Sequence, residues 1–222
     1  MASPEPGRNS SSPSASITDI RREGADGSAL RVRFDDGSFF FVDADSPLAA
    51  ELPDSGPLDE DRRSRLEQAD EAFRCRRKAL ELLARSEQCR RGLEAKLRRK
   101  QFSGGSVAAA LDRLEEAGSL DDRRFAEAWV RSRLRRRPEG AAKLRGALMS
   151  KGIASSVATE AVNRVLRDIG DPDSSAALER ALAKLRRRSG MDAEKLTAAM
   201  ARRGFPPSAV RRALRRAEGE DS

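Results

Sequence analysis

A short motif that recurs three times at an almost constant spacing limits the fold of this chain more than any other feature of its sequence. The motif joins a basic residue, a small or polar residue and a large apolar one: Lys100-Gln101-Phe102, Lys151-Gly152-Ile153 and Arg203-Gly204-Phe205, the apolar positions being 51 and 52 residues apart. Apolar pairs at i, i+4 precede each motif, namely Leu93 and Leu97, Leu144 and Leu148, and Leu196 and Met200, and further upstream Leu83, Leu134 and Leu185 keep a spacing of 51. This register predicts three tandem copies of one unit of about fifty residues.

Each copy is expected to fold as three helices. The first carries Leu83 or its equivalent, the second carries the i, i+4 pair, and the third begins just beyond the large apolar residue. Gly152 and Gly204 can adopt the left-handed conformation that closes a helix, and Pro206 and Pro207 suit the start of one. The sequence therefore predicts a mainly α fold whose three three-helix repeats form an elongated, curved body with contacts mostly between neighbours.

Two helix boundaries can be interpreted from local chemistry. Gly104-Gly105 is typical of a connector between helices. Ser119 with Asp122 resembles a capping box and predicts the start of the long helix of the second copy. Capping and the helix dipole also explain Asp121 and Asp122, with contact to a partner as the alternative. The sequence does not support a catalytic pair of carboxylates at Asp121 and Asp122, because it places no other reactive group beside them.

The region before the repeats has a different pattern. Ala29 to Phe34 alternates apolar and polar residues, Asp35-Asp36-Gly37 has turn chemistry, and Ser38 to Val42 is a second apolar run, so we predict a β-hairpin. Ile17 to Arg21 could add a third strand. Phe39, Phe40 and Phe41 are expected in the core of this small sheet, with an exposed interaction patch as the alternative. Residues 46–61, rich in Pro, Asp and Glu, are expected to be a connector.

Residue types that many sites need are absent. The chain has no His and two Cys, Cys75 and Cys89, which are expected to be separate thiols rather than a disulfide or metal pair. No nucleotide-binding glycine motif or cluster of metal-ligand residue types is present. The sequence predicts no catalytic residues, cofactor or metal, and the protein is not expected to be an enzyme.

These patterns give a domain plan. Short apolar stretches and an N-terminus without an apolar core favour a cytoplasmic protein with no membrane segment. The expected parts are a disordered tail (1–16), a small β-rich element with a linker (17–60), helical repeats at 61–118, 119–170 and 171–218, and an acidic tail (219–222).

Charge is distributed unevenly along the chain. Residues 1–60 hold five Arg and twelve Asp or Glu, a net charge of −7. Because the whole chain has a net charge of +8, residues 61–222 carry +15. A basic helical body predicts an acidic or polyanionic partner, although Arg-rich composition can also reflect the base content of a genome. A solvated helix end is the favoured explanation for any single arginine, but it explains less well that clusters recur at one point of successive repeats. The candidate partner-binding residues are Arg123, Arg124, Arg131, Arg135, Arg136, Arg137, Arg186, Arg187, Arg188, Lys100, Lys151 and Arg203.

One aromatic side chain has two interpretations. Trp129 follows Phe125 by four residues on one helical face, beside Ala126 and Val130. This position indicates core packing within the second copy, with an interface anchor as the alternative.

Several of these residues resemble a known family. The stretch Leu82 to Glu87, followed by Leu93 to Leu97 and Lys100-Gln101-Phe102, is similar to the first repeat of RecX proteins, and Gly118 to Ala126 with Lys151-Gly152-Ile153 is similar to the second. The run Asp121-Asp122-x-x-Phe125-Ala126 is the more specific signature. The resemblance covers about residues 62–217, and Gln101 departs from it by replacing a usual Gly.

This resemblance implies a function. RecX proteins modulate, and usually inhibit, the RecA recombinase by lying in the groove of its filament on single-stranded DNA, where they block filament extension, strand exchange and coprotease activity. It implies a monomeric regulator in homologous recombination, DNA repair and the SOS response. The alternative, from the residues alone, is a basic helical-repeat protein that binds DNA directly.

Overall fold

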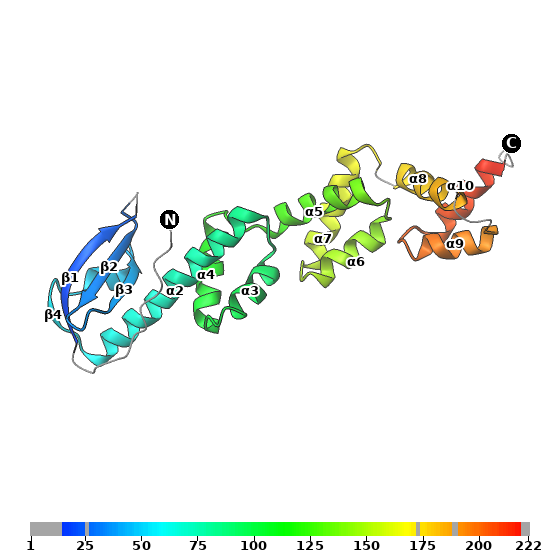
Figure 1. The fold of residues 1–222 in the computed structure, drawn as a ribbon. Helices are drawn as coiled ribbons and strands as arrows, with labels where there is room; N and C mark the ends of the chain where they lie inside the picture. The colour runs from blue at the N-terminus through cyan, green and yellow to red at the C-terminus, as the bar shows by residue number, and fades with distance from the viewer. Residues whose placement is uncertain (1–14, 25–26, 172–173, 188–190, 219–222) are drawn as a thin grey trace. The chain divides into compact units, whose positions relative to one another are not determined.

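The fold was analysed in a computed structural model, which describes residues 15–24, 27–171, 174–187 and 191–218 (Figure 1). The chain divides into two compact units. Unit 1 comprises Met1–Ser86 and Leu93–Ser119, and unit 2 comprises Glu87–Gly92 and Leu120–Ser222. Helices dominate the described residues and a small sheet lies near the N-terminus, which confirms the predicted mainly α class with three-helix repeats.

Unit 1 opens with an antiparallel sheet. The strands are β1 (Ser16–Glu23), β2 (Ala29–Phe34), β3 (Phe39–Asp43) and the short β4 (Gly56–Pro57), and their order in the sheet is β3-β2-β1-β4. The predicted hairpin and third strand are therefore present, with a fourth strand added at the edge. The turn that joins β2 to β3 closes with Gly37 at φ 82, where the amide of Gly37 donates to the carbonyl of Phe34 at 3.1 Å.

The three consecutive phenylalanines of β3 do not share one environment. Successive residues of a strand point to opposite faces, so Phe40 lies in the core, with its ring 5.5 Å from that of Phe34 in an edge-to-face arrangement. Phe39 is 39% exposed and Phe41 is half-buried, stacked 5.5 Å from Phe73. The core prediction is confirmed for Phe40 and wrong for Phe39.

The predicted connector at 46–61 contains regular structure, which corrects that expectation. Helix α1 (Pro47–Glu51) begins at Ser46, whose hydroxyl accepts from the amide of Ala49, and proline occupies its first turn. β4 then pairs Gly56 and Pro57 with the start of β1. The predicted N-terminal tail also ends earlier, because Ala15 is buried and Ser16 begins β1. The rest of that tail, residues 1–14, lies outside the described residues.

The helical part of unit 1 consists of α2 (Glu60–Arg85), most of α3 (Arg90–Arg98) and α4 (Gly104–Glu116). Leu66 of α2 joins the sheet core, while the predicted pair Leu93 and Leu97 of α3 is fully buried. The N-terminus of α4 is tied to α2 by Glu71. Its carboxylate accepts from the amide of Ser103 at 2.8 Å and from the hydroxyls of Ser103 and Ser106 at 2.6 and 2.7 Å.

Gly104 and Gly105 form the first turn of α4 instead of a connector. Ser103 caps this helix by accepting from the amide of Ser106, so a serine cap places the two glycines inside the helix. The connector prediction at this point was wrong.

Arg63 of α2 is buried inside unit 1, as is Asp70 of the same helix. Arg63 is only 4% exposed, and its guanidinium has no hydrogen-bond partner among the described residues. The nearest carboxylate is that of Glu67 at 3.5 Å, and the Phe34 ring lies 5.4 Å below the guanidinium carbon. A buried charge in such a poor hydrogen-bonding environment costs stability.

Unit 2 contains two three-helix sets. The first is α5 (Asp122–Arg136), α6 (Ala141–Ser150) and α7 (Ser155–Asp168), and the second is α8 (Ser175–Arg186), α9 (Ala193–Ala201) and α10 (Pro207–Glu218). Their cores contain the predicted pairs Leu144 with Leu148 and Leu196 with Met200. Leu83, Leu134 and Leu185 are all half-buried, which is consistent with their common place in the repeat.

The second helix of each set ends in the same backbone conformation. Gln101, Gly152 and Gly204 have φ values of 66, 92 and 84, so the left-handed closure expected for the two glycines is confirmed. Gln101 adopts it without being glycine, at a cost of about 1–2 kcal/mol. Gln101 therefore replaces the usual Gly without changing the turn.

The start of α5 differs from the predicted capping box. The cap is Asp121, whose carboxylate accepts from the amides of Arg123 and Arg124 at 2.8 and 3.1 Å, and not Ser119. Asp122 instead accepts from the amide of Arg90 at 2.7 Å. The interpretation of Asp121 as a capping residue is confirmed.

A contact between a helix-connecting loop and a left-handed turn occurs twice within unit 2. The amide of Gly140, before α6, donates to the carbonyl of Arg203 at 2.9 Å. Cys89 stands 51 residues before Gly140, and its thiol donates to the carbonyl of Lys151 at 3.5 Å. Lys151 is the basic residue of the second motif, as Arg203 is of the third. Gly140 also approaches Gly204 so closely that a Cβ on Gly140 would lie 2.2 Å from the Gly204 carbonyl oxygen. The repeated sequence motif thus has a repeated packing role.

Cys75 and Cys89 are both free and buried, which confirms that they do not pair with each other. The acidic tail 219–222 lies outside the described residues.

Candidate partner-binding surface

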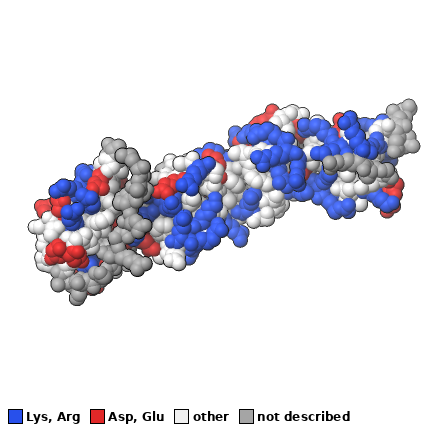
Figure 2. Space-filling model, viewed as in Figure 1, with Lys and Arg blue, Asp and Glu red and all other residues white. Residues whose placement is uncertain are grey.

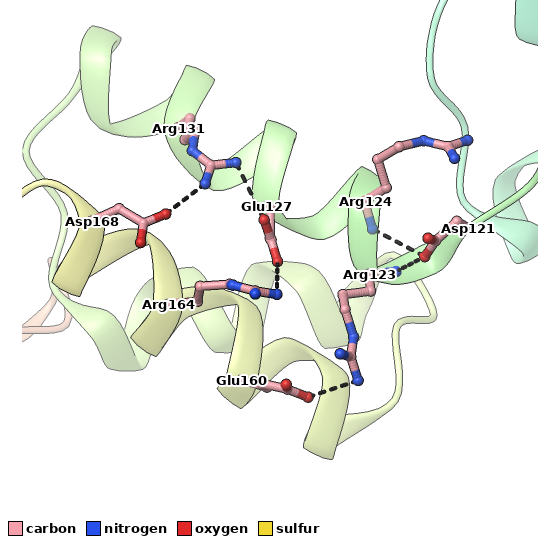
Figure 3. Close-up of polar contacts among 8 residues, drawn as sticks. All are labelled: Asp121, Arg123, Arg124, Glu127, Arg131, Glu160, Arg164 and Asp168. Atoms are coloured by element: carbon pink, nitrogen blue, oxygen red, sulfur yellow. Dashed lines mark hydrogen bonds and ion pairs between the residues drawn. The ribbon is translucent and has the colours of Figure 1, made fainter.

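Acidic side chains pair with several of the predicted partner-binding arginines and so link α5 to α7. Figure 3 shows the side chains of Arg123, Arg131 and Arg164 pointing toward carboxylates of the facing helix, while that of Arg124 points away from α7. The pairs are Arg123 with Glu160 (3.0 Å), Arg131 with Asp168 (2.7 Å) and with Glu127 (3.3 Å), and Arg164 with Glu127 (3.3 Å). Arg124 pairs separately with Glu87 at 2.7 Å.

This pairing changes how those arginines are interpreted. The hydrogen bond that Arg131 donates to Asp168 raises the pKa of its guanidinium, and the bond from Arg124 to Glu87 does the same for the pKa of Arg124. Exposed pairs of this kind contribute about 0–1 kcal/mol each. Arg123, Arg124 and Arg131 thus already have anionic partners within unit 2.

A second ionic cluster closes the end of α5. Arg133 donates two bonds to Glu139, at 2.8 and 3.1 Å, and Lys143 lies 3.4 Å from the same carboxylate. Burial acts to raise the pKa of Glu139, but the two cations outweigh it and lower that pKa. The ring of Trp129 has the Arg133 guanidinium and the Lys151 ammonium each 5.7 Å from its centroid.

Trp129 itself is half-buried and packs against the core of α5 to α7. The predicted core packing is therefore confirmed, with two cations against its ring.

Arg135, Arg136 and Arg137 form a different kind of group, here called the α5 arginine cluster. All three are exposed, and in the described part of the chain none of their side chains has an ion pair or a hydrogen bond. Arg137 is the residue after the helix, in an extended conformation at φ −146. Cations at a helix C-terminus also face its negative dipole end. Among the described residues, these three arginines therefore keep their charge available for a partner.

The remaining predicted residues lie at two kinds of helix end. Arg186 ends α8 and Arg187 follows it, both exposed, whereas Arg188 lies outside the described residues. Lys100, Lys151 and Arg203 occupy the left-handed turns, the first two exposed and Arg203 half-buried. On the face drawn in Figure 2, basic side chains cover much of α5 to α10.

Sequence reasoning missed Glu139 and Arg164. Glu139 stands directly after a proline that ends a run of arginines, and only its burial, 3% exposed, shows that it organises the end of α5. Arg164 has no distinguishing neighbour in the sequence, because its partner Glu127 is 37 residues away.

Other kinds of site find no support in the described residues. They contain no group of three or more Asp, Glu or Cys side chains placed to hold a metal ion. No described helix combines the length and apolar character needed to cross a membrane.

These features define a class of protein: a modular helical protein whose consecutive three-helix sets carry exposed arginines at helix ends. Comparison with known proteins gives the family. The model of the second three-helix domain of RecX matches residues 121–162, and that of the first matches residues 75–114.

Relatives and solved structures agree with these matches. The regulatory protein RecX of Chlorobium phaeobacteroides is 38% identical over 140 residues, 61% of this chain and 88% of that protein, and that of Chlorobaculum tepidum is 38% identical over 144 residues, 65% and 88%. A crystal structure of regulatory protein RecX has a TM-score of 0.71 at 20% identity, covering 88% of this chain and 96% of that one. RecX from Lactobacillus salivarius has a TM-score of 0.56 at 20% identity, covering 67% and 97%. The chain belongs to the RecX family, and the protein has a regulatory role.

Proposed function

We propose that the protein binds the RecA filament on single-stranded DNA and restrains its recombinase and coprotease activities. Family membership supports a regulatory role, and the sign of the charge supports the partner. Residues 61–222 carry a formal charge of +15, and a filament on DNA presents phosphates to such a surface.

The single observation that carries the proposal is the α5 arginine cluster. Its three guanidiniums are exposed and have no anionic partner among the described residues, whereas Arg123, Arg124 and Arg131 use theirs within unit 2. An unpaired guanidinium can give both of its donor edges to a phosphate or carboxylate without first breaking an internal bond. We therefore assign the first contact with the filament to this cluster, ahead of the other candidate residues.

The test compares two double charge reversals. Arg135→Glu with Arg136→Glu reverses two of the three charges of the cluster, and Arg211→Glu with Arg212→Glu makes the same change of charge at two exposed positions of α10 outside it. Far-UV circular dichroism checks that both variants keep their helices. The assay follows DNA-dependent ATP hydrolysis by RecA, with the protein at far below one copy per recombinase subunit.

Wild type and the α10 variant are expected to suppress hydrolysis, and the cluster variant to lose at least tenfold in potency, about 1.4 kcal/mol of binding free energy. Equal potency of the two variants would refute the assignment to the cluster. Absence of suppression by wild type, at a salt concentration that abolishes its binding to naked DNA, would refute the filament as target. Tight sequence-selective duplex binding would instead support the alternative of a protein that acts directly on DNA.

A further inference from the structure

Three arginines on the helices of unit 1 are neutralised by carboxylates from the acidic region before them. Arg76 of α2 and Arg113 of α4 both donate to the carboxylate of Asp43, at the end of β3. Arg113 also lies 3.9 Å from Asp45, and Arg65 of α2 pairs with Glu51 of α1 at 2.8 Å. One short acidic segment, residues 43–51, thus contacts cations on two different helices.

The same arginines border a hollow in unit 1. It has a volume of about 410 Å³ and is lined by residues of the end of β3, of α1, of α2 and of α4. Arg65, Arg76 and Arg113 line it, and much of the remaining wall consists of alanines, among them Ala69 and Ala110. Small side chains leave room for a bulky group to approach the guanidiniums closely.

The carboxylate of Asp43 binds two arginines at once. Its side chain is 12% exposed, and it accepts from two guanidiniums that no other described residue bridges. A phosphodiester has two free oxygens and can accept from two arginines in the same way. Because Asp43 belongs to the same compact unit as both arginines, it competes with any external anion at a high effective concentration.

We propose that Arg65, Arg76 and Arg113 form a latent binding surface for the phosphates of single-stranded nucleic acid, which the segment 43–51 occupies and thereby blocks. Without displacement of this segment, direct binding of nucleic acid depends on the other basic surfaces. With displacement, unit 1 adds up to three phosphate contacts. Nucleic acid is favoured over an acidic peptide because three arginines from two helices line one hollow of about 410 Å³, where successive phosphates of one strand could meet them.

The experiment uses the full chain and no recombinase, so that its outcome is independent of the function proposed above. Asp43→Asn removes the carboxylate that Arg76 and Arg113 share, and Arg113 keeps only its longer contact with Asp45. Asp54→Asn removes the same charge from the same region at an exposed residue with no ion pair among the described residues. Binding of a 20-nucleotide oligothymidylate is measured by fluorescence anisotropy over a series of salt concentrations.

Each phosphate contact to a single strand adds about 0.7 to the slope of log K against log salt. The Asp43→Asn variant is expected to steepen that slope by up to about 1.4, for two released arginines, and to bind more tightly at low salt. Asp54→Asn is expected to keep the wild-type slope. Adding Arg113→Gln to Asp43→Asn should remove about half of the gain.

One arm of the test does not depend on the folding of the Asp43 variant. Arg113→Gln in the wild-type background should leave the slope unchanged, because Arg113 is already occupied, whereas Arg135→Gln should reduce it. Equal slopes for Asp43→Asn and Asp54→Asn, or a loss of slope on Arg113→Gln alone, would overturn the proposal. So would a gain in binding of polyglutamate by Asp43→Asn without any gain for oligothymidylate.

Discussion

Replacing Gly140 by alanine tests the repeated loop-to-turn contact within unit 2. Gly140 has φ −76 and ψ 161, which any residue can adopt, so alanine causes no strain in its own backbone. Its Cβ, however, would lie 2.2 Å from the carbonyl oxygen of Gly204 and 2.8 Å from the amide nitrogen of Phe205. Both of these are backbone atoms, which cannot rotate away as a side chain would, so the two segments must separate.

The expected loss follows from the contacts that separation removes. The hydrogen bond from the Gly140 amide to the Arg203 carbonyl, 2.9 Å long, contributes about 1 kcal/mol. Overpacking of a close contact costs about 1–3 kcal/mol, and the reduced freedom of the unfolded chain returns about 0.4–1 kcal/mol. We expect Gly140→Ala to lower the free energy of unfolding by about 2 kcal/mol as the balance of these terms.

The matched control is Gly146→Ala. Gly146 lies within α6, is exposed, and has no heavy atom within 4 Å of its added Cβ, so alanine should stabilise that helix by about 0.5–1 kcal/mol. Urea unfolding followed by the fluorescence of Trp129, the only tryptophan, reports on unit 2. If Gly140→Ala unfolds within about 0.5 kcal/mol of wild type, a margin well below the predicted loss, the contact does not couple the two segments.

Three further predictions concern unit 1. Arg63→Met should raise the free energy of unfolding by about 1 kcal/mol in urea titrations, because it removes a buried guanidinium without a hydrogen-bond partner among the described residues. The control is Arg62→Met, at an exposed position. A lower free energy of unfolding for Arg63→Met would contradict the reasoning. Burial, with a smaller effect of Glu71, raises the pKa of the Cys75 thiol to about 11. In a variant that lacks Cys89, the reaction of Cys75 with a disulfide reagent at about pH 8 should therefore be slow until urea unfolds the chain. Rapid labelling of the native protein would instead show that the thiol is accessible. Burial acts to raise the pKa of Glu71, but hydrogen bonds from the start of α4 outweigh it and lower the pKa below the ordinary 4.5. The ionised form of Glu71 therefore stabilises the fold above pH 4.5, and this contribution is lost as the pH falls through the lowered pKa. The difference in free energy of unfolding between wild type and Glu71→Gln should accordingly shrink in acid. A difference that does not change with pH would show that folding does not alter the pKa of Glu71.

The sequence predicted the helical repeats well because their evidence is periodic. The pairs Leu93 with Leu97 and Leu144 with Leu148 repeat at one register, and burying both members of a pair requires a helix at the same place in each copy. The short elements α1 and β4 were missed because five and two residues are too few to show a period. The cap of Ser46 determines where α1 begins, and pairing with β1 determines where β4 lies. Strand pairing is a tertiary contact, which a local sequence pattern does not show.

The candidate surface was less predictable, because charge availability depends on neighbours in space. Arg131 and Arg135 lie four residues apart on α5 and are equivalent in the sequence, yet Arg131 meets Asp168 of α7, 37 residues away, and Arg135 has no ion pair among the described residues. The position of α7 along α5 decides this difference, since the carboxylates of α7 meet α5 at Arg123 and Arg131 and not at its last two residues. The arginines of the α5 arginine cluster are those beyond the reach of α7. For this reason a partner that recognises this cluster would distinguish the folded protein from an unfolded chain of the same charge.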